Sequence, residues 1–260
     1  MIRFRLFGIP VGIHLSFLLI ALFGLQVYRG TEIVAWTLGV GLAVLFHELG
    51  HAITARSFRA TTVAVTLFAL GGYTTWAPGE QPIGAGRRFL IAASGSAVGI
   101  ALGGSVLLLG RQGAFDSVGR FSEVLIQSFV LAALVWGIFN WLPVLPLDGG
   151  HMAQSALALV LGEHRALRAA KVLSVVIGIA AVAFAWIQLN EPVLGLWVAL
   201  IVAMGLRSEA APTLPAERSS PSGPAVAPAD HPDVDSPIDA QPPEFGGASD
   251  PRDEPPVFPI

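Results

Sequence analysis

Long apolar segments alternate with short polar stretches along the first 207 residues. An apolar segment of about 18 or more residues can cross a bilayer as a helix. Five segments reach that length and a sixth is shorter: Val11–Tyr28, Ile33–Ala55, Phe89–Gly110, Phe121–Trp141, Val172–Leu189 and the shorter Pro192–Leu206. This pattern predicts an all-α membrane protein with about six transmembrane helices.

The segment Thr61–Trp76 departs from that helical pattern. Residues 61–70 are rich in Thr and Val, and Gly71–Gly72 favours a hairpin turn before Tyr73. The segment is too short for two spans and too apolar for an ordinary loop. We predict a small re-entrant β-hairpin in which Gly71, Gly72 and Tyr73 contact substrate. Its edge would pair with an extended peptide, or the hairpin would only fill the helix bundle, and both interpretations stay open.

The composition agrees with a membrane protein. The chain is 53% hydrophobic and 13% charged, with a mean hydropathy of +0.67, whereas soluble domains carry roughly 25% charged residues. It has no cysteine, which excludes disulfides and cysteine-held metals. The N-terminus is basic and then apolar like a signal peptide, but no small-residue cleavage site follows, so we expect a retained first span.

Residues 208–260 differ sharply from the rest of the chain. They are rich in proline and acidic residues, and they have too little apolar surface to offset the entropy of ordering. We therefore predict two parts. Residues 1–207 form a polytopic membrane domain, and residues 208–260 form a Pro-rich, acidic, disordered tail.

The basic residues predict the orientation. With six spans and the N-terminus inside, ten basic residues of the first 207 lie on the cytoplasmic side and three lie outside. We expect a multi-pass protein of the inner (cytoplasmic) membrane with both termini in the cytoplasm. The lipid bilayer is then its environment, and we expect no nucleic acid partner. A homo-oligomer is left open.

Three ionisable residues lie together in the second apolar segment, in the stretch AVLFHELGHAITA. Such residues are costly inside a bilayer and indicate a functional site. His47 and His51 are four residues apart, so on a helix they share one face. Glu48 lies beside them. This H-E-x-x-H spacing is typical of a zinc site, in which two imidazoles hold the metal and the carboxylate reaches a water molecule.

A catalytic zinc ion usually has three protein ligands, so one more is needed. Asp148, in the stretch NWLPVLPLDGGH, is the candidate, because it lies at the cytoplasmic end of its span. The second span also ends on the cytoplasmic side, at Arg56, and His51 is five residues from that end, so both residues are expected at a similar depth. Pro143 and Pro146 predict broken backbone there, which is tolerated at membrane depth only inside protein or beside a wet cavity. The alternative is that Asp148 caps the next helix.

The two motifs together resemble those of a known protein family. HELGH, followed about a hundred residues later by N-x-x-P-x-x-P-L-D-G-G, resembles the site-2 protease family of intramembrane zinc metalloproteases, over about residues 1–207. The chain is similar to compact prokaryotic members and has no room for a PDZ or CBS domain. The resemblance implies one zinc ion per chain, held by His47, His51 and Asp148, with Glu48 as the catalytic acid/base.

The resemblance also implies a substrate class. Members of this family cleave single-pass membrane proteins, such as anti-sigma factors or remnant signal peptides, within or near the transmembrane segment. Asn140 is the candidate donor to the oxyanion of the cleavage reaction, and a hydrogen bond between helices is its alternative role. The stretch SGSAVG, Ser94 to Gly99, lacks the proline and asparagine frequent in the family, so no role is transferred to it.

Several roles and functions remain as alternatives. His151 is either a spare ligand or a helix-surface residue, and we expect His14 to make an internal hydrogen bond. The main alternative function is a non-proteolytic metal-binding or metal-transporting membrane protein. A transporter would need polar residues along several spans, and beyond Glu48 and Asp148 the chain offers almost none. A catalytically silent relative would be free to lose the motif, which is intact.

Overall fold

A computed structural model describes residues 1–69, 71–188, 190, 192–207, 258 and 259. Six long helices dominate it, preceded by the 3-10 helix Leu15–Leu19 and the short α1 (Ile20–Gly24). The long helices are α2 (Thr31–Ser57), α3 (Ala85–Arg111), α4 (Arg120–Phe139), α5 (Asp148–Leu161), α6 (Glu163–Ile187) and α7 (Pro192–Leu206). The strands are β1 (Ile2–Leu6), β2 (Ile9–Ile13), β3 (Thr61–Phe68), β4 (Gly71–Ala77) and β5 (Phe258–Pro259).

Among the described residues, four helices are long and apolar enough to cross a membrane: α2, α3, α4 and α6. They correspond to the second to fifth predicted spans. The sixth predicted span forms α7, which has 15 residues. The six-span count is therefore not confirmed, although the fold is that of a membrane protein.

The first predicted span, Val11–Tyr28, does not form one helix. Its start belongs to β2, and the 3-10 helix and α1 follow. Two contacts account for this: Val11, Gly12 and Ile13 pair with the distant strand β3, and the imidazole of His14 accepts a hydrogen bond from the backbone N–H of Ser16. The expected internal hydrogen bond of His14 is thus present, as the N-terminal cap of the 3-10 helix.

The structure is mostly helical, as predicted, but its β structure extends beyond the one predicted hairpin: among the described residues, five strands form a sheet of order β1-β2-β3-β4-β5. β2 runs parallel to β3, and the other pairs are antiparallel. The predicted hairpin is present as β3 and β4. Gly71 and Gly72 pair with Phe68 and Leu67, so both glycines lie in the strand and not in the turn.

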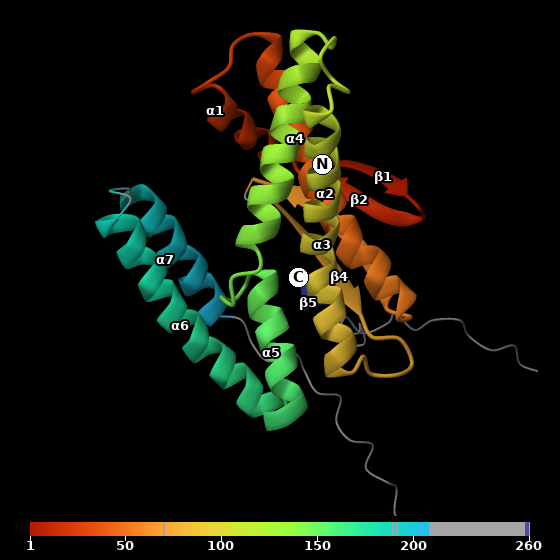
Figure 1. Cartoon of the computed structure of the whole chain (residues 1–260). Coiled ribbons are helices and arrows are strands. Elements are labelled where there is room, and N and C mark those ends of the chain that lie inside the picture. Colours follow the sequence, from red (N-terminus) through yellow and green to blue (C-terminus); the bar gives the residue numbers. More distant parts are fainter. Residues whose placement is uncertain (70, 189, 191, 208–257, 260) are drawn as a thin grey trace, which may run out of the picture. The chain divides into compact units, whose positions relative to one another are not determined.

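α2 is the centre of the bundle and packs against α3, α4, β3 and β4 (Figure 1). Glycines allow the close approach. A Cβ added to Gly50 would lie 2.8 Å from the carbonyl oxygen of Ser94 on α3, and one added to Gly39 would meet the carbonyl of Leu125 on α4. α5 continues from α4 and leads to the α6–α7 pair. The sheet and α5 thus meet around α2 and α3 in the interior of the bundle.

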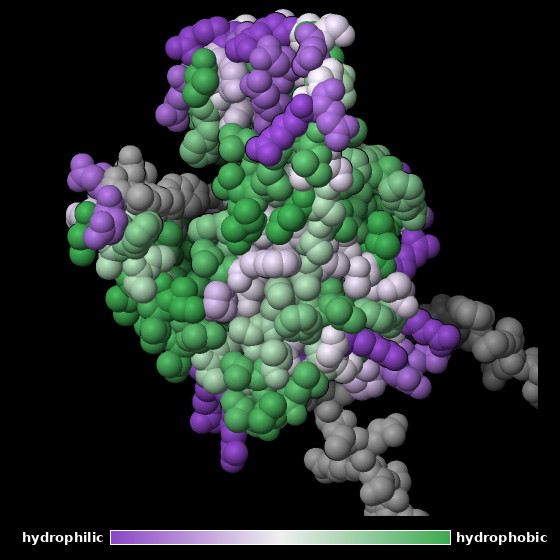
Figure 2. Space-filling view, viewed as in Figure 1, coloured by the Kyte–Doolittle hydropathy of each residue, from purple (hydrophilic) through white to green (hydrophobic). Residues whose placement is uncertain are grey.

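The outer faces of the helices are apolar. Val135 and Ile138 on α4 are 57% and 63% exposed, and Val176 and Ile179 on α6 are 59% and 66% exposed. Figure 2 shows hydrophobic residues over much of this surface, with hydrophilic residues gathered toward opposite ends. Large exposed apolar areas mark a surface that is covered by a partner or by lipid. On helices of this length, lipid is the natural cover.

Candidate metal centre

α2 supplies three ionisable side chains to one buried place. His47, Glu48 and His51 are 3%, 3% and 1% exposed. The two imidazoles lie one turn apart, with their Nε2 atoms 3.2 Å from each other. Burial of such groups within a spanning helix needs a compensating partner.

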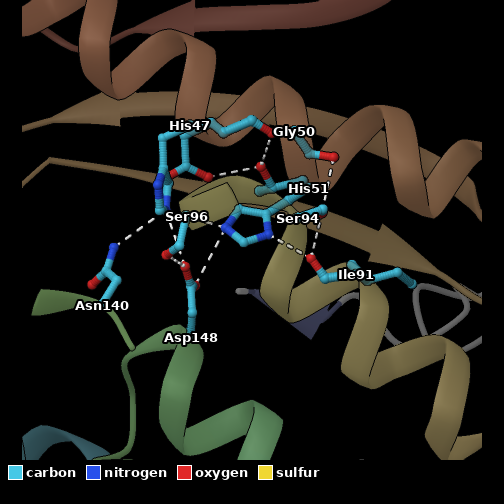
Figure 3. A network of polar contacts seen from close by, with 10 residues as sticks. His47, Gly50, His51, Ile91, Ser94, Ser96, Asn140 and Asp148 are labelled. Carbon is cyan, nitrogen blue, oxygen red and sulfur yellow. Dashed lines mark hydrogen bonds and ion pairs between the residues drawn. The ribbon is translucent and has the colours of Figure 1, made fainter. Parts of the chain in front are cut away.

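The first residue of α5 supplies that partner. The Oδ2 atom of Asp148 lies 3.2 Å from Nε2 of His47, and its Oδ1 atom lies 3.3 Å from Nε2 of His51 (Figure 3). Residues 101 positions apart in the chain thus form one cluster. Leu147, and not Asp148, is the N-cap of α5, and its side chain makes no capping bond. The carboxylate therefore faces the histidines and does not cap the helix.

α3 orients the ring of His51. Nδ1 of His51 lies 2.7 Å from the carbonyl oxygen of Ile91 (Figure 3). Because a carbonyl can only accept, Nδ1 carries the proton and donates it, and Nε2 keeps a free electron pair toward the cluster. Gly95 makes room for this ring, because an added Cβ would lie 2.5 Å from Cε1 of His51.

A serine of α3 orients the aspartate. The hydroxyl of Ser96, which is fully buried, donates to Oδ2 of Asp148 at 2.9 Å. Ser94, two residues earlier, donates to the Ile91 carbonyl and to the carbonyl of Gly50 on α2 (2.7 and 3.0 Å). The SGSAVG stretch, to which no role was transferred from the family, therefore supports the cluster through Ser94 and Ser96.

The loop between α4 and α5 sets the position of Asp148. The backbone N–H of Gly149 donates to the carbonyl of Asn140 at 2.6 Å, and the N–H of Leu145 donates to the hydroxyl of Ser174 on α6 at 2.8 Å. A Cβ on Gly149 would meet the carbonyls of Trp141 and Leu142. The predicted broken backbone around Pro143 and Pro146 thus turns back tightly and is buried in protein.

Asn140 ends α4 beside the histidines. Its amide nitrogen lies 3.2 Å from Nε2 of His47, and the residue is 6% exposed. The structure therefore brings Asn140 to the cluster. Nδ1 of His47 is buried and has no hydrogen-bond partner among the described residues.

β4 holds Glu48. The hydroxyl of Thr74 lies 2.8 Å from Oε2 of Glu48 and 3.0 Å from its backbone carbonyl. Gly72 packs directly on the same side chain, since an added Cβ would lie 2.6 Å from its Cγ. Of the three hairpin residues chosen from the sequence, Gly72 alone touches Glu48. Gly71 faces Trp136, and the ring of Tyr73 packs edge-on against Phe68.

Sequence reasoning missed Ser96 and Thr74. Both carry hydroxyls, which are common in membrane helices and strands, and both contact residues far away in the chain. The local signal is weak: Ser96 lies in a segment of small and apolar residues, and Thr74 is one of several threonines in the predicted hairpin. His151 is not part of the group of three that could hold a metal ion.

The donor set fits a zinc ion. The three candidate ligand atoms lie within 4.8 Å of one another. Zinc in proteins is tetrahedral, with bonds of about 2.0–2.2 Å to histidine and carboxylate ligands, which sets neighbouring ligand atoms about 3.3–3.6 Å apart. The observed separations are 3.2 Å between the imidazoles and 3.2 and 3.3 Å from each imidazole to the carboxylate. The residues present therefore suit the metal.

Comparisons with known proteins agree with the fold and the cluster. The model of peptidase family M50 matches residues 112–184, which include Asn140 and Asp148. A zinc metalloprotease of Methanocaldococcus jannaschii is 24% identical over 211 residues, covering 79% of this chain and 59% of that protein. Rip3 of Mycobacterium tuberculosis, provisionally named a zinc metalloprotease, is 32% identical over 184 residues, covering 65% of this chain and 45% of that protein.

A solved structure shares the fold. The site-2 protease from Methanocaldococcus jannaschii superimposes with a TM-score of 0.58 at 22% identity, covering 82% of this chain and 98% of that chain. The fold and the buried cluster define an integral membrane protein with a metal-binding core. The resemblance to the site-2 protease family that the two motifs predicted is confirmed. The chain spans about half the length of the curated relatives that it matches.

Proposed function

We propose that this chain is an intramembrane zinc metalloprotease that cleaves peptide bonds within or near the transmembrane segment of single-pass membrane proteins. One observation carries the proposal. The two imidazoles and the Glu48 carboxylate lie on α2, which is long and apolar enough to span a membrane, and the Asp148 carboxylate at the start of α5 converges on them. Buried ionisable groups in a spanning segment are costly, so four of them together indicate a functional site.

His47, His51 and Asp148 would hold one zinc ion per chain, and Glu48 would be the acid/base. Zinc bound by these three residues would supply a water molecule of lowered pKa and a Lewis acid for the peptide carbonyl. Glu48 takes the proton of the attacking water and passes it to the leaving amine. Thr74 keeps the Glu48 carboxylate aimed during both transfers. Asn140 would donate its amide N–H to the developing oxyanion, and its position 3.2 Å from Nε2 of His47 supports this role.

The sheet is suited to present an unwound substrate. A transmembrane helix hides its peptide groups in its own hydrogen bonds, so a protease must bind it extended. β4 lies against Glu48 and pairs with β3 on one side. Its other edge can pair with a substrate strand next to Gly71, Gly72 and Tyr73. Glu48 is eight residues, or about 12 Å, from Arg56, which supports a re-entrant sheet at the depth of the metal.

Location and domain organisation remain part of the proposal. We infer a multi-pass protein of the inner membrane with cytoplasmic termini. The contact between the Arg56 guanidinium and the carbonyl of Phe7 (2.8 Å) supports this, since it joins the basic N-terminal hairpin to the basic end of α2. Residues 1–207 form the protease domain. The tail predicted for residues 208–260 lies outside the described residues, except for Phe258 and Pro259.

The substrates proposed are anti-sigma factors or remnant signal peptides. A comparison of the membrane proteomes of wild type and the Glu48→Gln variant identifies them, because uncut fragments build up in the variant. A homo-oligomer is compatible with the exposed apolar surface, and the size of the detergent-free protein in lipid nanodiscs measures it.

The test of the function is cleavage by the Glu48→Gln variant. In proteoliposomes containing a single-pass test substrate, we expect the cleavage rate to fall about 100- to 10,000-fold, because the proton transfer is lost, while zinc stays bound. Glu80→Gln is the matched control, since Glu80 is exposed and lies outside the cluster. Normal turnover by Glu48→Gln would refute the proposed role of Glu48.

A further inference from the structure

The outer edge of β4 is already partly covered. In the sheet, β1 lies at one end, and β5, at residues Phe258–Pro259, lies at the other, on β4 (Figure 1). Trp76 of β4 is opposite Phe258, and Thr75 is opposite Pro259. Fifty residues, 208–257, lie between Arg207, which follows α7, and this strand. A distant part of the chain therefore returns to the sheet beside the cluster.

The register points β5 toward the catalytic carboxylate. The pairing is antiparallel, so the chain advances along β4 from Trp76 to Thr75 and then toward Thr74. Thr74 is the residue whose hydroxyl lies 2.8 Å from Oε2 of Glu48. The position that β5 covers is thus next to the residue that aims the acid/base.

We propose that the β4 edge binds the chain's own segment at Phe258–Pro259 as a strand, and that a substrate must displace this segment before it can be cleaved. The inference rests on the proposed function, because it assigns the same edge to the substrate. Strand addition recognises backbone groups, which every peptide carries, so a segment of this chain and a substrate strand compete for the same donors and acceptors.

The pairing has the properties of a displaceable competitor. It covers two residues of β4, whereas β4 has seven. Proline has no N–H, so among the two residues of β5 only Phe258 can donate to β4. A longer substrate strand would make more backbone hydrogen bonds with β4 and would displace β5. Because the segment is part of the same chain, its binding is intramolecular, and it opposes weak or short peptides more effectively than a free peptide would.

A cross-link tests the pairing without any need for activity. The chain has no cysteine, so Thr75→Cys with Pro259→Cys introduces a single pair. Opposite residues of antiparallel strands have Cα atoms about 4.5–5.5 Å apart, within the range for a disulfide. In full-length protein in membranes, we expect mild oxidation to form this disulfide at least tenfold faster than in the control Thr75→Cys with Phe245→Cys. Equal rates would overturn the pairing.

The same variant tests the competition. The oxidised, locked protein is expected to cleave a single-pass substrate at least tenfold more slowly than the same preparation after treatment with a phosphine reductant. Equal rates in the two forms would overturn the competition. If neither form cleaves any substrate while Glu48 is intact, the proposed function fails, and the cross-linking rate still decides the pairing.

A milder variant measures the competition at equilibrium. Phe258→Pro removes the donor of β5, so we expect the apparent KM for the substrate to fall severalfold with kcat unchanged. Phe245→Pro, the same change elsewhere in the tail, should alter neither. An unchanged KM in Phe258→Pro would contradict a competing strand.

Discussion

The buried cluster brings two imidazoles and a carboxylate, which are common zinc ligands, within 3.2–3.3 Å of one another. Nδ1 of His51 donates its proton to the Ile91 carbonyl, so the unprotonated Nε2 atom faces Oδ1 of Asp148 at 3.3 Å. Ser96 donates to the other carboxylate oxygen. The contact of His51 with Ile91 and the contact of Asp148 with Ser96 thus leave acceptor atoms of both residues facing the centre of the cluster. A metal ion is the partner that makes this arrangement favourable.

Gly95 gives a test of the ring position at the scale of one residue. An added methyl in Gly95→Ala would overlap the His51 ring, which is held by the Ile91 carbonyl. We expect purified Gly95→Ala to lose nearly all of its zinc, as measured by elemental analysis. Gly104→Ala on the same helix is the control, since an added Cβ there meets nothing within 4 Å. Equal zinc content in both variants would show that the ring is placed differently.

The sequence predicts a site residue where an ionisable side chain lies in an apolar segment. His47, Glu48, His51 and Asp148 are ionisable groups in apolar segments, and the motif spacing places the first three on one helix. Ser96 was not predictable, because its partner is 52 residues away and a serine in a membrane helix has many other uses. The same holds for Thr74, whose partner is on α2.

At the scale of elements, the sheet positions Glu48 and the start of α5 positions Asp148. β4 lies on α2 because Gly72 has no side chain at the contact with Glu48. α5 begins where the loop after Asn140 folds back, and its first residue faces α2. His47, His51 and Glu48 share α2, but different elements support them: β4 contacts Glu48, whereas α3 contacts His51 and Asp148. A change in β4 should therefore affect Glu48 without removing the metal ligands.

Gly72→Ala tests that separation. The added methyl would lie 2.6 Å from Cγ of Glu48 and must push the side chain or β4 away. A misplacement of about 1 Å can cost roughly 100-fold in rate. We expect cleavage to fall by about that factor with a full zinc content. Gly86→Ala, which has open space, should keep both. Loss of zinc in Gly72→Ala would contradict the independence of β4 and the metal ligands.

Helices and the hairpin were predicted well because their signals are local. Four of the predicted spans match α2, α3, α4 and α6 within a few residues, except that α6 begins earlier, at Glu163. The wider sheet was not predicted, because Val11 pairs with Val65 across 54 residues, and a pattern of apolar residues does not show such pairing. The apolar run of the first predicted span gave no sign that its start is a strand.

At the scale of the whole molecule, apolar outer faces and the distribution of arginines determine how the protein sits in the bilayer. Arg87 and Arg111 lie near the two ends of α3, which has 27 residues and a length of about 40 Å. A helix of this length spans the hydrocarbon core of about 30 Å. The two residues should then face opposite compartments.

Cysteine labelling in intact cells tests the orientation, because the chain has no cysteine of its own. We expect a membrane-impermeant thiol reagent to label Arg111→Cys directly and to label Arg87→Cys only after the membrane is opened. Labelling of Arg87→Cys in intact cells, with protection of Arg111→Cys, would reverse the proposed orientation. Labelling of both in intact cells would contradict a spanning α3.

The central claim is that α2 and α5 together hold one metal ion through His47, His51 and Asp148. The most direct test is the zinc content per chain of Asp148→Ala, measured by elemental analysis beside wild type and Glu48→Gln. The account predicts about one zinc per chain in wild type and Glu48→Gln and almost none in Asp148→Ala. A full complement of zinc in a folded Asp148→Ala protein would contradict it.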